Sequence, residues 1–275
     1  SFIYCMNKWL LYFLLECFVF PACGDSDASA DANSDETAVA APVNLSFQVL
    51  NQFPHDTTAF TEGFTFYDGK LYESTGSPDA PHNSGTWIGA VDLQSGKVDK
   101  KVELGTSYFG EGIVFFKDKI YQLTWQTKKG FVYDAKTFKK LREFSYGSEG
   151  WGLTHDGENL IMSTGTSNLY YLTPDSLNFV KMLPVQDNNG YVGSLNELEY
   201  INGYIYANQW LTPNILKIDP ATGYVVAKLD LSKQVAEVKT KFPGAQEMNG
   251  IAYDSTTQKT FITGKKWPVI YEIKW

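Results

Sequence analysis

The stretch FTEGFTFYDGK, residues 60–70, decides the fold, because four further versions of it follow along the chain. They read FGEGIVFFKDK at 109–119, EGWGLTHDGEN at 149–159, NELEYINGYIY at 196–206 and EMNGIAYDSTT at 247–257. Each version has a polar or aromatic residue and a small one before a strand, then a turn and a second strand. When the versions are aligned, one anchor position is held by Glu62, Glu111, Trp151, Glu197 and Asn249.

The spacing of the anchors predicts a five-bladed β-propeller. They lie about 49, 40, 46 and 52 residues apart, which is the length of one propeller blade. Five blades around one axis would bring the anchor side chains together, so we look for function there. The alternative, a β-sandwich with coincidental turns, does not explain why both length and turn position repeat.

The strands within the repeats predict four antiparallel strands per blade. In the first blade they are expected at 63–67, 70–75, 86–93 and 97–104. The last blade has only three, at 251–253, 260–263 and 269–275. We therefore expect residues 45–53 to supply the missing outer strand and close the ring, which removes an open sheet edge. A short helix is expected at 231–241, and the propeller domain at 45–275.

The N-terminal region has the features of an export signal. Residues 1–22 contain Lys8 and an apolar run at 9–20 that is too short for a stable membrane span. The run leads into Cys23 in a context that resembles a bacterial lipobox, which implies cleavage before Cys23 and lipidation of its thiol. The alternative is an ordinary signal peptide cut near Ala22. We expect a protein of the bacterial cell envelope, with the membrane leaflet left open.

Residues 23–44 are expected to form a flexible acidic spacer, since their composition cannot bury enough apolar surface to fold. Five acidic residues and no basic one lie between 24 and 44, and Lys8 balances Glu16, so the total formal charge of −8 leaves −3 for the rest. A nearly neutral body without a basic run argues against nucleic-acid binding.

The scarcity of cysteine and histidine excludes several kinds of site. The three cysteines all lie within the first 23 residues, and the chain has only three histidines. A thiol nucleophile, a disulfide or a cysteine-ligated zinc in the body is therefore excluded, and a His-rich metal site is disfavoured.

Several phrases resemble, in order and at similar spacing, the plant-type glutaminyl-peptide cyclotransferases, a family that also occurs in bacteria. They are Tyr108 to Gly112, Trp125, Glu149 to Gly152, Asn196 to Glu199 and Asn249 to Ala252. The resemblance covers essentially residues 45–275. It implies a five-bladed propeller that converts N-terminal glutamine into pyroglutamate and releases ammonia.

The resemblance also implies that Glu111 is the catalytic acid and base. The substrate's α-amine attacks its own side-chain carboxamide, so proximity is supplied by the substrate itself. A carboxyl group beside both nitrogens can carry the proton from one to the other. The alternative for Glu111 is a structural glutamate that binds backbone amides at the start of its blade.

The remaining site residues are expected to bind the substrate. Trp125, Trp151 and Trp210 match pocket tryptophans of the family, and Phe60 and Phe109 would complete an aromatic cup, although many aromatics must be ordinary blade packing. Asn196 and Lys266 match positions that polarise the amide carbonyl or contact the substrate. Strand alternation leaves open whether Asn196 or Glu197 faces the axis, and Lys266 could be an ordinary surface lysine.

Two anchors add polar groups to this predicted site. Asn249 is placed in it by its anchor position. Glu62 departs from the family, in which many members have glutamine there. Two carboxyl groups in one pocket would repel each other and raise the pKa of one of them, and Glu62 could also bind the substrate's ammonium group.

Two other functions fit a propeller and stay open from the sequence. One is a non-catalytic propeller that binds a peptide or glycan at its axis. The other is a metal-dependent hydrolase with carboxylates and amides around calcium, although tryptophans at the anchors disfavour a hydrated metal. We expect a monomer that acts on peptides or proteins with N-terminal glutamine and requires no cofactor, with a structural calcium possible.

Overall fold

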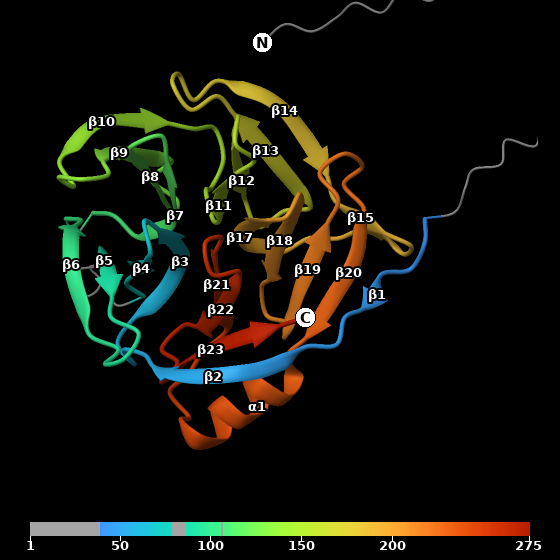
Figure 1. Cartoon of the computed structure of the whole chain (residues 1–275). Coiled ribbons are helices and arrows are strands. Elements are labelled where there is room, and N and C mark those ends of the chain that lie inside the picture. Colours follow the sequence, from blue (N-terminus) through green and yellow to red (C-terminus); the bar gives the residue numbers. More distant parts are fainter. Residues whose placement is uncertain (1–38, 79–85, 106) are drawn as a thin grey trace, which may run out of the picture. The chain divides into compact units, whose positions relative to one another are not determined.

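The computed structural model describes residues 39–78, 86–105 and 107–275. Within these ranges, five sheets surround a common centre, each with the first strand of its blade innermost (Figure 1). The innermost strands are β3, β7, β11, β17 and β21. This is the five-bladed, four-stranded propeller that the repeat predicts, so that prediction is confirmed.

The blades follow one another along the chain. The first contains β3 (Phe60–Tyr67), β4 (Lys70–Gly76), β5 (Trp87–Val91) and β6 (Val98–Glu103). The second contains β7 (Gly110–Phe116), β8 (Lys119–Thr124), β9 (Lys129–Asp134) and β10 (Lys140–Ser145). The third contains β11 (Leu153–His155), β12 (Leu160–Ser163), β13 (Asn168–Leu172) and β14 (Phe179–Pro184). A small hairpin, β15 (Gln186–Asp187) and β16 (Gly190–Tyr191), leads to the fourth blade.

The fourth blade carries an extra strand. It contains β17 (Leu195–Ile201), β18 (Tyr204–Gln209), β19 (Asn214–Ile218) and β20 (Val225–Asp230). The short β1 (Val43–Asn44) pairs with β20 in parallel. The two residues of β1 belong to the stretch expected to be spacer, so folded structure begins before residue 45. Residues 23–38 of the expected spacer lie outside the described residues.

The ring closes as predicted. The fifth blade contains β21 (Met248–Asp254), β22 (Lys259–Gly264) and β23 (Val269–Lys274), and the N-terminal β2 (Gln48–Pro54) pairs with β23 in antiparallel fashion. In Figure 1 the blue β2 lies alongside the red β23, so the two ends of the domain complete one sheet. The helix α1 (Ser232–Lys241) lies between the fourth and fifth blades in the chain, where a helix was expected.

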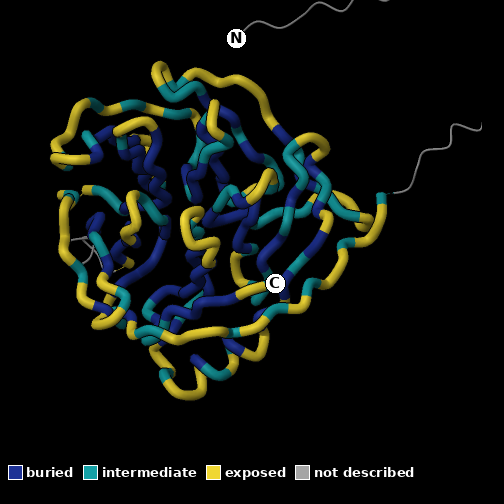
Figure 2. The backbone as a smooth tube through the Cα atoms, viewed as in Figure 1, coloured by how far each residue is buried: buried dark blue, intermediate teal, exposed yellow. Residues whose placement is uncertain are grey.

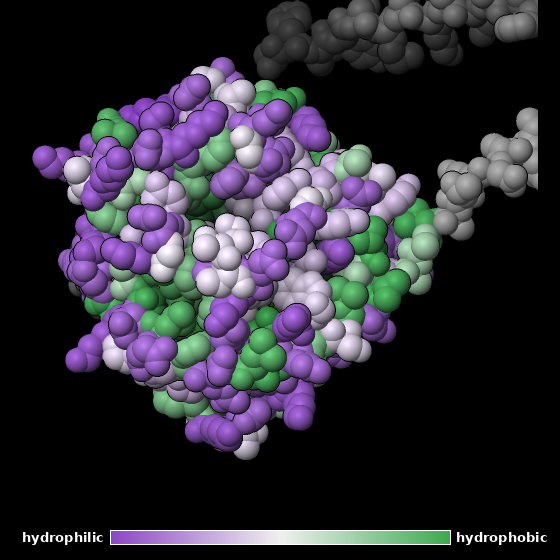
Figure 3. Space-filling model, viewed as in Figure 1, coloured by the Kyte–Doolittle hydropathy of each residue, from purple (hydrophilic) through white to green (hydrophobic). Residues whose placement is uncertain are grey.

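The hydrophobic core consists of layers between neighbouring blades. One cluster joins Phe64 and Leu71 to Phe261 and Ile270, across the first and fifth blades. Equivalent clusters fill the other four interfaces, and Val238 of α1 adds to the one between the fourth and fifth. Buried backbone therefore gathers around the axis, whereas β6, β10, β14 and β2 are largely exposed (Figure 2). Hydrophilic side chains cover much of the outer rim in the space-filling view (Figure 3).

The repeated phrase has a physical explanation at the axis. The glycine after an anchor lets the innermost strands approach closely: a Cβ on Gly112 would lie 2.6 Å from the Trp151 carbonyl oxygen, and one on Gly152 would lie 2.1 Å from that of Asn196. The turn that follows the anchor in the first version of the phrase has the expected geometry. Asp68 and Gly69 both have positive φ, as a tight two-residue hairpin requires.

Candidate active site

Four of the five anchor residues occupy β-bulges, and this determines where their side chains point. Register shifts interrupt the innermost strands between Thr61 and Gly63, Gly110 and Ile113, Leu195 and Leu198, and Met248 and Ile251. A bulge bends its strand and re-aims a side chain. In four of the five blades, the side chain of the anchor is therefore not bound to the regular in–out alternation of its strand. All four bulges lie near the start of an innermost strand, at the same end of the propeller axis.

A cup with a volume of about 390 Å³ lies at this end of the axis. Eight of the ten predicted site residues line it: Phe60, Glu62, Phe109, Glu111, Trp125, Trp151, Asn196 and Trp210. They come from four blades and are brought together only by the closed ring. Pro78 and Lys265 complete the lining, and sequence reasoning identified neither.

The wall of the cup is aromatic. Phe109 packs edge-on against Phe60, with ring centroids 5.9 Å apart, and against Trp125 at 5.6 Å. Trp151 packs edge-on against Trp210, at 5.5 Å. Contacts of this kind fix ring orientations and exclude water. The cup can therefore hold a small amphipathic group such as a glutaminyl side chain.

The cup also contains two buried carboxyl groups and one buried ammonium. The Lys265 Nζ lies 2.7 Å from the Glu62 Oε1 and 4.5 Å from the centroid of the Phe60 ring. The carboxyl of Glu111 hydrogen-bonds to that of Glu62. The three groups thus form a compact cluster, Glu111–Glu62–Lys265, in which one positive charge faces two acids.

Burial and repulsion decide how this cluster ionises. Burial raises the pKa of Glu62 to about 7, although Lys265 opposes the shift. Burial and the neighbouring Glu62 raise the pKa of Glu111 well above its ordinary value. Burial alone would lower the pKa of Lys265, but Glu62 and Glu111 outweigh it and raise that pKa. Lys265 is therefore charged, Glu62 ionises beside it around neutral pH, and Glu111, whose pKa the Glu62 charge raises, is the carboxyl group that keeps the proton once Glu62 has ionised.

Asn196 faces the cup and has an unused polar atom. Its Oδ1 is buried and has no hydrogen-bond partner among the described residues. The oxygen and nitrogen of an asparagine amide are assigned from their partners, so what the structure establishes is a free amide end in the cup. Such a group can bind the carboxamide of a substrate.

Glu197, the anchor next to Asn196, has a structural role. Its carboxyl accepts hydrogen bonds from the backbone N–H groups of Phe64, at 3.3 Å, and Ile251, at 2.8 Å. This resolves the question that alternation left open, because Asn196 lines the cup and Glu197 joins three blades. It is also the structural role that sequence analysis considered as the alternative for Glu111.

Two predicted site residues lie outside the cup lining. Asn249 is buried behind Glu62, and its Nδ2 donates to the Glu62 Oε2 at 3.2 Å and to the Thr61 carbonyl oxygen at 3.0 Å. Lys266 is the second of them, and the neighbouring Lys265 supplies the cup's ammonium. Lys266 has a positive φ of 59°, which turns the chain at this point, and its backbone N–H donates to the Ala59 carbonyl oxygen. From the sequence alone, without knowledge of that turn, it could not be decided which of the two adjacent lysines faces the cup.

A buried pair supports the cup from behind. The His55 Nε2 lies 3.2 Å from the Glu73 carboxyl, which also accepts a hydrogen bond from the Thr61 hydroxyl at 2.6 Å. Burial lowers the pKa of His55, but Glu73 outweighs this effect and the pKa is raised. The pair fixes the strand segment that carries Glu62.

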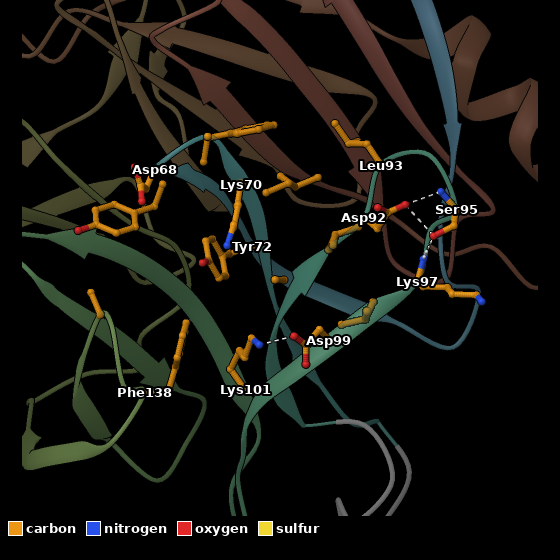
Figure 4. Close-up of a pocket in the computed structure, with 18 of the residues that line it drawn as sticks. Asp68, Lys70, Tyr72, Asp92, Leu93, Ser95, Lys97, Asp99, Lys101 and Phe138 are labelled. Carbon is orange, nitrogen blue, oxygen red and sulfur yellow. Dashed lines mark hydrogen bonds and ion pairs between the residues drawn. The ribbon is translucent and has the colours of Figure 1, made fainter.

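A larger hollow of about 1020 Å³ lies away from the cup, at the turns of the first blade (Figure 4). Three of its charged groups are engaged with neighbours: Lys101 pairs with Asp99, and the Asp92 carboxylate accepts hydrogen bonds from the backbone and hydroxyl of Ser95. None of the predicted site residues lines it. We therefore locate the active site in the smaller cup, where buried acids and aromatics converge.

Two observations concern metals and membranes. Among the described residues, no group of three or more His, Cys, Asp and Glu side chains is arranged to hold a metal ion. In the same part of the chain, no helix has the length and apolar character that a membrane crossing requires. Cys23 and the predicted signal peptide lie outside the described residues.

Comparison with known proteins gives a consistent picture. The sequence model of the family described as glutamine cyclotransferase matches residues 22–275. A glutaminyl-peptide cyclotransferase of Arabidopsis thaliana is 38% identical over 230 residues, which are 82% of this chain and 70% of that protein. The crystal structure of Myxococcus xanthus glutaminyl cyclase is similar with a TM-score of 0.76 and 33% identity, over 85% of this chain and 97% of that one.

Proposed function

The chain belongs to the glutamine cyclotransferase family, and on that premise we propose that Glu111 carries the proton in the cyclisation of N-terminal glutamine. The chain is an enzyme that converts the N-terminal glutamine of peptides into pyroglutamate and releases ammonia. The observation that carries the proposed mechanism is the pair of buried carboxyl groups, Glu111 and Glu62, beside Lys265 in an aromatic cup.

The reaction needs proton transfer and little else. The neutral α-amine attacks the carbon of the side-chain carboxamide, and a new C–N bond closes the five-membered ring. The bond to the amide nitrogen then breaks. The attacking nitrogen loses one proton and the departing nitrogen gains one, so the enzyme returns to its initial state.

Glu111 suits this transfer because it holds a proton at neutral pH. It donates that proton to the departing nitrogen, which leaves as ammonia, and it regains one from the attacking amine. A general acid works best when its pKa lies near the working pH, and burial together with Glu62 raises the pKa of Glu111 in that direction. Lys265 and Asn249 hold Glu62 in place as the anion.

The other groups of the cup bind and orient the substrate. Asn196 lines the cup, and its side-chain N–H group, once it occupies the end of the amide without a partner, donates to the carboxamide oxygen, where negative charge develops during attack. The tryptophans enclose the side chain in its bent, reactive shape and exclude water. Exclusion of water strengthens each of these electrostatic interactions.

We propose that catalysis needs no metal. The carboxyl groups that could bind calcium at the axis are engaged otherwise: Glu62 faces the Lys265 ammonium, and Glu197 accepts two backbone N–H groups. A cation next to Lys265 would meet a like charge. This favours the cyclotransferase over the metal-dependent hydrolase, and a buried acid in the cup favours it over a non-catalytic binding propeller.

One assay separates these functions. A dipeptide that begins with glutamine is incubated with the protein, with and without a chelator, and both ammonia and pyroglutamyl peptide are measured. We expect equal amounts of the two products at a rate that the chelator leaves unchanged. Loss of activity with chelator would overturn the metal-free mechanism, and absence of both products would overturn the activity.

We propose further that Cys23 carries a lipid that anchors the enzyme in a bacterial cell envelope. The support is the lipobox-like context of Cys23 and the acidic, polar stretch that follows it. Lipid chains anchor a protein by burying their methylene groups in the bilayer. Cys23→Ser should release the enzyme from the membrane fraction, and a variant that still sediments with membranes would contradict the proposal.

We also propose that the enzyme acts as a monomer without nucleic acid. The closing strand β2 comes from the same chain as β23, so one chain completes the ring. The formal charge of −3 after residue 44 offers no attraction to phosphates. A mass of two chains by light scattering, or retention on DNA at physiological salt, would contradict these points.

A further inference from the structure

Glu149 lies at the boundary between two walls of the cup. It precedes Trp151 in the third blade, and Trp125 follows β8 in the second. The indole Nε1 of Trp125 donates to the Glu149 Oε2 at 3.0 Å, and that of Trp151 donates to the same oxygen at 3.1 Å. One carboxylate oxygen therefore binds two pocket tryptophans from different blades.

The backbone around both tryptophans is fixed independently. The backbone N–H of Trp125 donates to the Phe109 carbonyl oxygen, and that of Trp151 donates to the Ser163 carbonyl oxygen, both at 3.0 Å. The Tyr146 hydroxyl donates to the Thr124 carbonyl oxygen at 2.6 Å. These bonds fix the chain but leave the indole rings free to turn about their side-chain bonds.

The indole rings need a further restraint, which Glu149 provides. An indole has a single polar atom, a donor at the ring edge, so the partner of that donor sets the ring's tilt. Trp125 contacts Phe109, and Trp151 contacts Trp210, so fixing the two indoles also fixes the aromatic contacts on each side. Hydrogen bonds to a carboxylate are stronger than neutral ones.

We propose that Glu149 is a positioning residue, which sets the tilt of Trp125 and Trp151 and thereby the shape of the cup that bends the substrate. Glu149 does not line the cup itself, so it acts through the two indoles. This inference rests on the cyclotransferase activity for its kinetic part. Its spectroscopic part needs no activity and therefore tests it separately.

The decisive comparison is Glu149→Ala with Glu149→Gln. Alanine removes the acceptor, whereas glutamine keeps a carbonyl oxygen with two lone pairs, which can accept both indoles. Because a displacement of about 1 Å can cost about a hundredfold in rate, we expect Glu149→Ala to lower kcat/KM by about 10- to 100-fold. Glu149→Gln should stay within about threefold, since it replaces charged by neutral hydrogen bonds.

Tryptophan emission reports on the proposed contact without substrate. The emission spectrum of Glu149→Ala should differ from that of the wild type, and the spectrum of Glu149→Gln should resemble the wild type. The control is Glu158→Ala, which removes an exposed glutamate of the same blade and should change neither emission nor kcat/KM.

Three results would overturn the inference. The first is wild-type kcat/KM in Glu149→Ala. The second is an equal loss in the Ala and Gln variants, which would make charge and not geometry responsible. The third is a loss of activity in Glu149→Ala with unchanged emission.

If Glu149→Ala does not fold, Trp125→Phe and Trp151→Phe carry the test. Each keeps an aromatic ring and removes one donor to Glu149. We expect each to lower kcat/KM several-fold, because the ring that remains has no donor with which to bind Glu149. Wild-type activity in both variants would overturn the inference.

Discussion

Replacing Glu62 with glutamine should move the alkaline limb of the kcat–pH profile to lower pH. In the wild type, Glu62 is the anion next to Glu111, and its charge is one of the two main reasons why the pKa of Glu111 is raised. Glutamine at position 62 removes that repulsion. Lys265, which lies 2.7 Å from Glu62, stays in place and then favours the ionised form of Glu111.

The size of the shift can be bounded. Two unit charges roughly 4 Å apart interact by about 4 kcal/mol at an effective dielectric constant near 20, and one pKa unit corresponds to about 1.36 kcal/mol. Loss of the Glu62 charge can therefore lower the pKa of Glu111 by at most about 3 units. Lys265 and Asn249 already hold the Glu62 carboxyl, which disperses its charge, so we expect the alkaline limb to move to lower pH by less than this bound.

The sign follows from the role of Glu111 as an acid. Activity is present while Glu111 holds its proton and is lost as the pH rises through its pKa, so a lower pKa ends activity at a lower pH. The assay is kcat for a glutamine dipeptide from pH 5 to 10, followed by ammonia release. We choose kcat because kcat/KM also reports the free substrate amine, which titrates near pH ~8.

Glu158→Gln, at an exposed position, is the matched control and should leave the profile unchanged. A Glu62→Gln enzyme whose alkaline limb stays in place, or moves to higher pH, would refute the reasoning that Glu62 raises the pKa of Glu111.

Three further predictions follow from the placement of single elements. Lys265→Met should lower kcat/KM by about tenfold or more, since it leaves the Glu62 charge buried without a partner, whereas Lys266→Met should stay within about twofold; steady-state kinetics of the two variants checks this, and equal losses would contradict it. Removing residues 1–40 should leave the melting temperature unchanged, while removing β2 as well should lower it by several degrees or abolish folding, because β23 becomes an open edge; equal melting temperatures would rule out the closure. Glu197→Gln should lower stability by about 1–3 kcal/mol, because one backbone N–H loses its acceptor, with kcat nearly unchanged; a selective loss of kcat in urea-stable protein would contradict its structural role.

The repeat made the fold predictable, because it carries both of the properties that define a blade. Its period sets blade length. The glycine that follows four of the five anchors is the sequence sign of strands that approach closely at the axis, as they do at Gly112 and Gly152. The missing strand in the last blade also predicted closure by β2. All of these features can be read from a single sequence, because they depend only on local residue patterns, on the repeat length and on the number of strands in each repeat.

The site was only partly predictable, because its details depend on bulges and turns. Strand alternation could not place Asn196 and Glu197, since a bulge between Leu195 and Leu198 breaks that alternation. Lys265 was missed because a positive φ at Lys266 decides which lysine faces the cup. Glu149 was visible in the phrase that resembles the family, but its two indole partners lie in different blades and only the folded ring brings them together.

The most direct test of the account is the turnover of Glu111→Gln on a glutamine dipeptide, measured together with its affinity for an unreactive peptide analogue. The substitution keeps the size of the side chain and its hydrogen bonds but removes the exchangeable acid. We predict a loss in kcat of about a hundredfold or more, as is usual when a general acid–base group is removed, with a much smaller change in affinity. A Glu111→Gln enzyme that releases ammonia at nearly the wild-type rate would contradict the account and assign the proton transfer to Glu62.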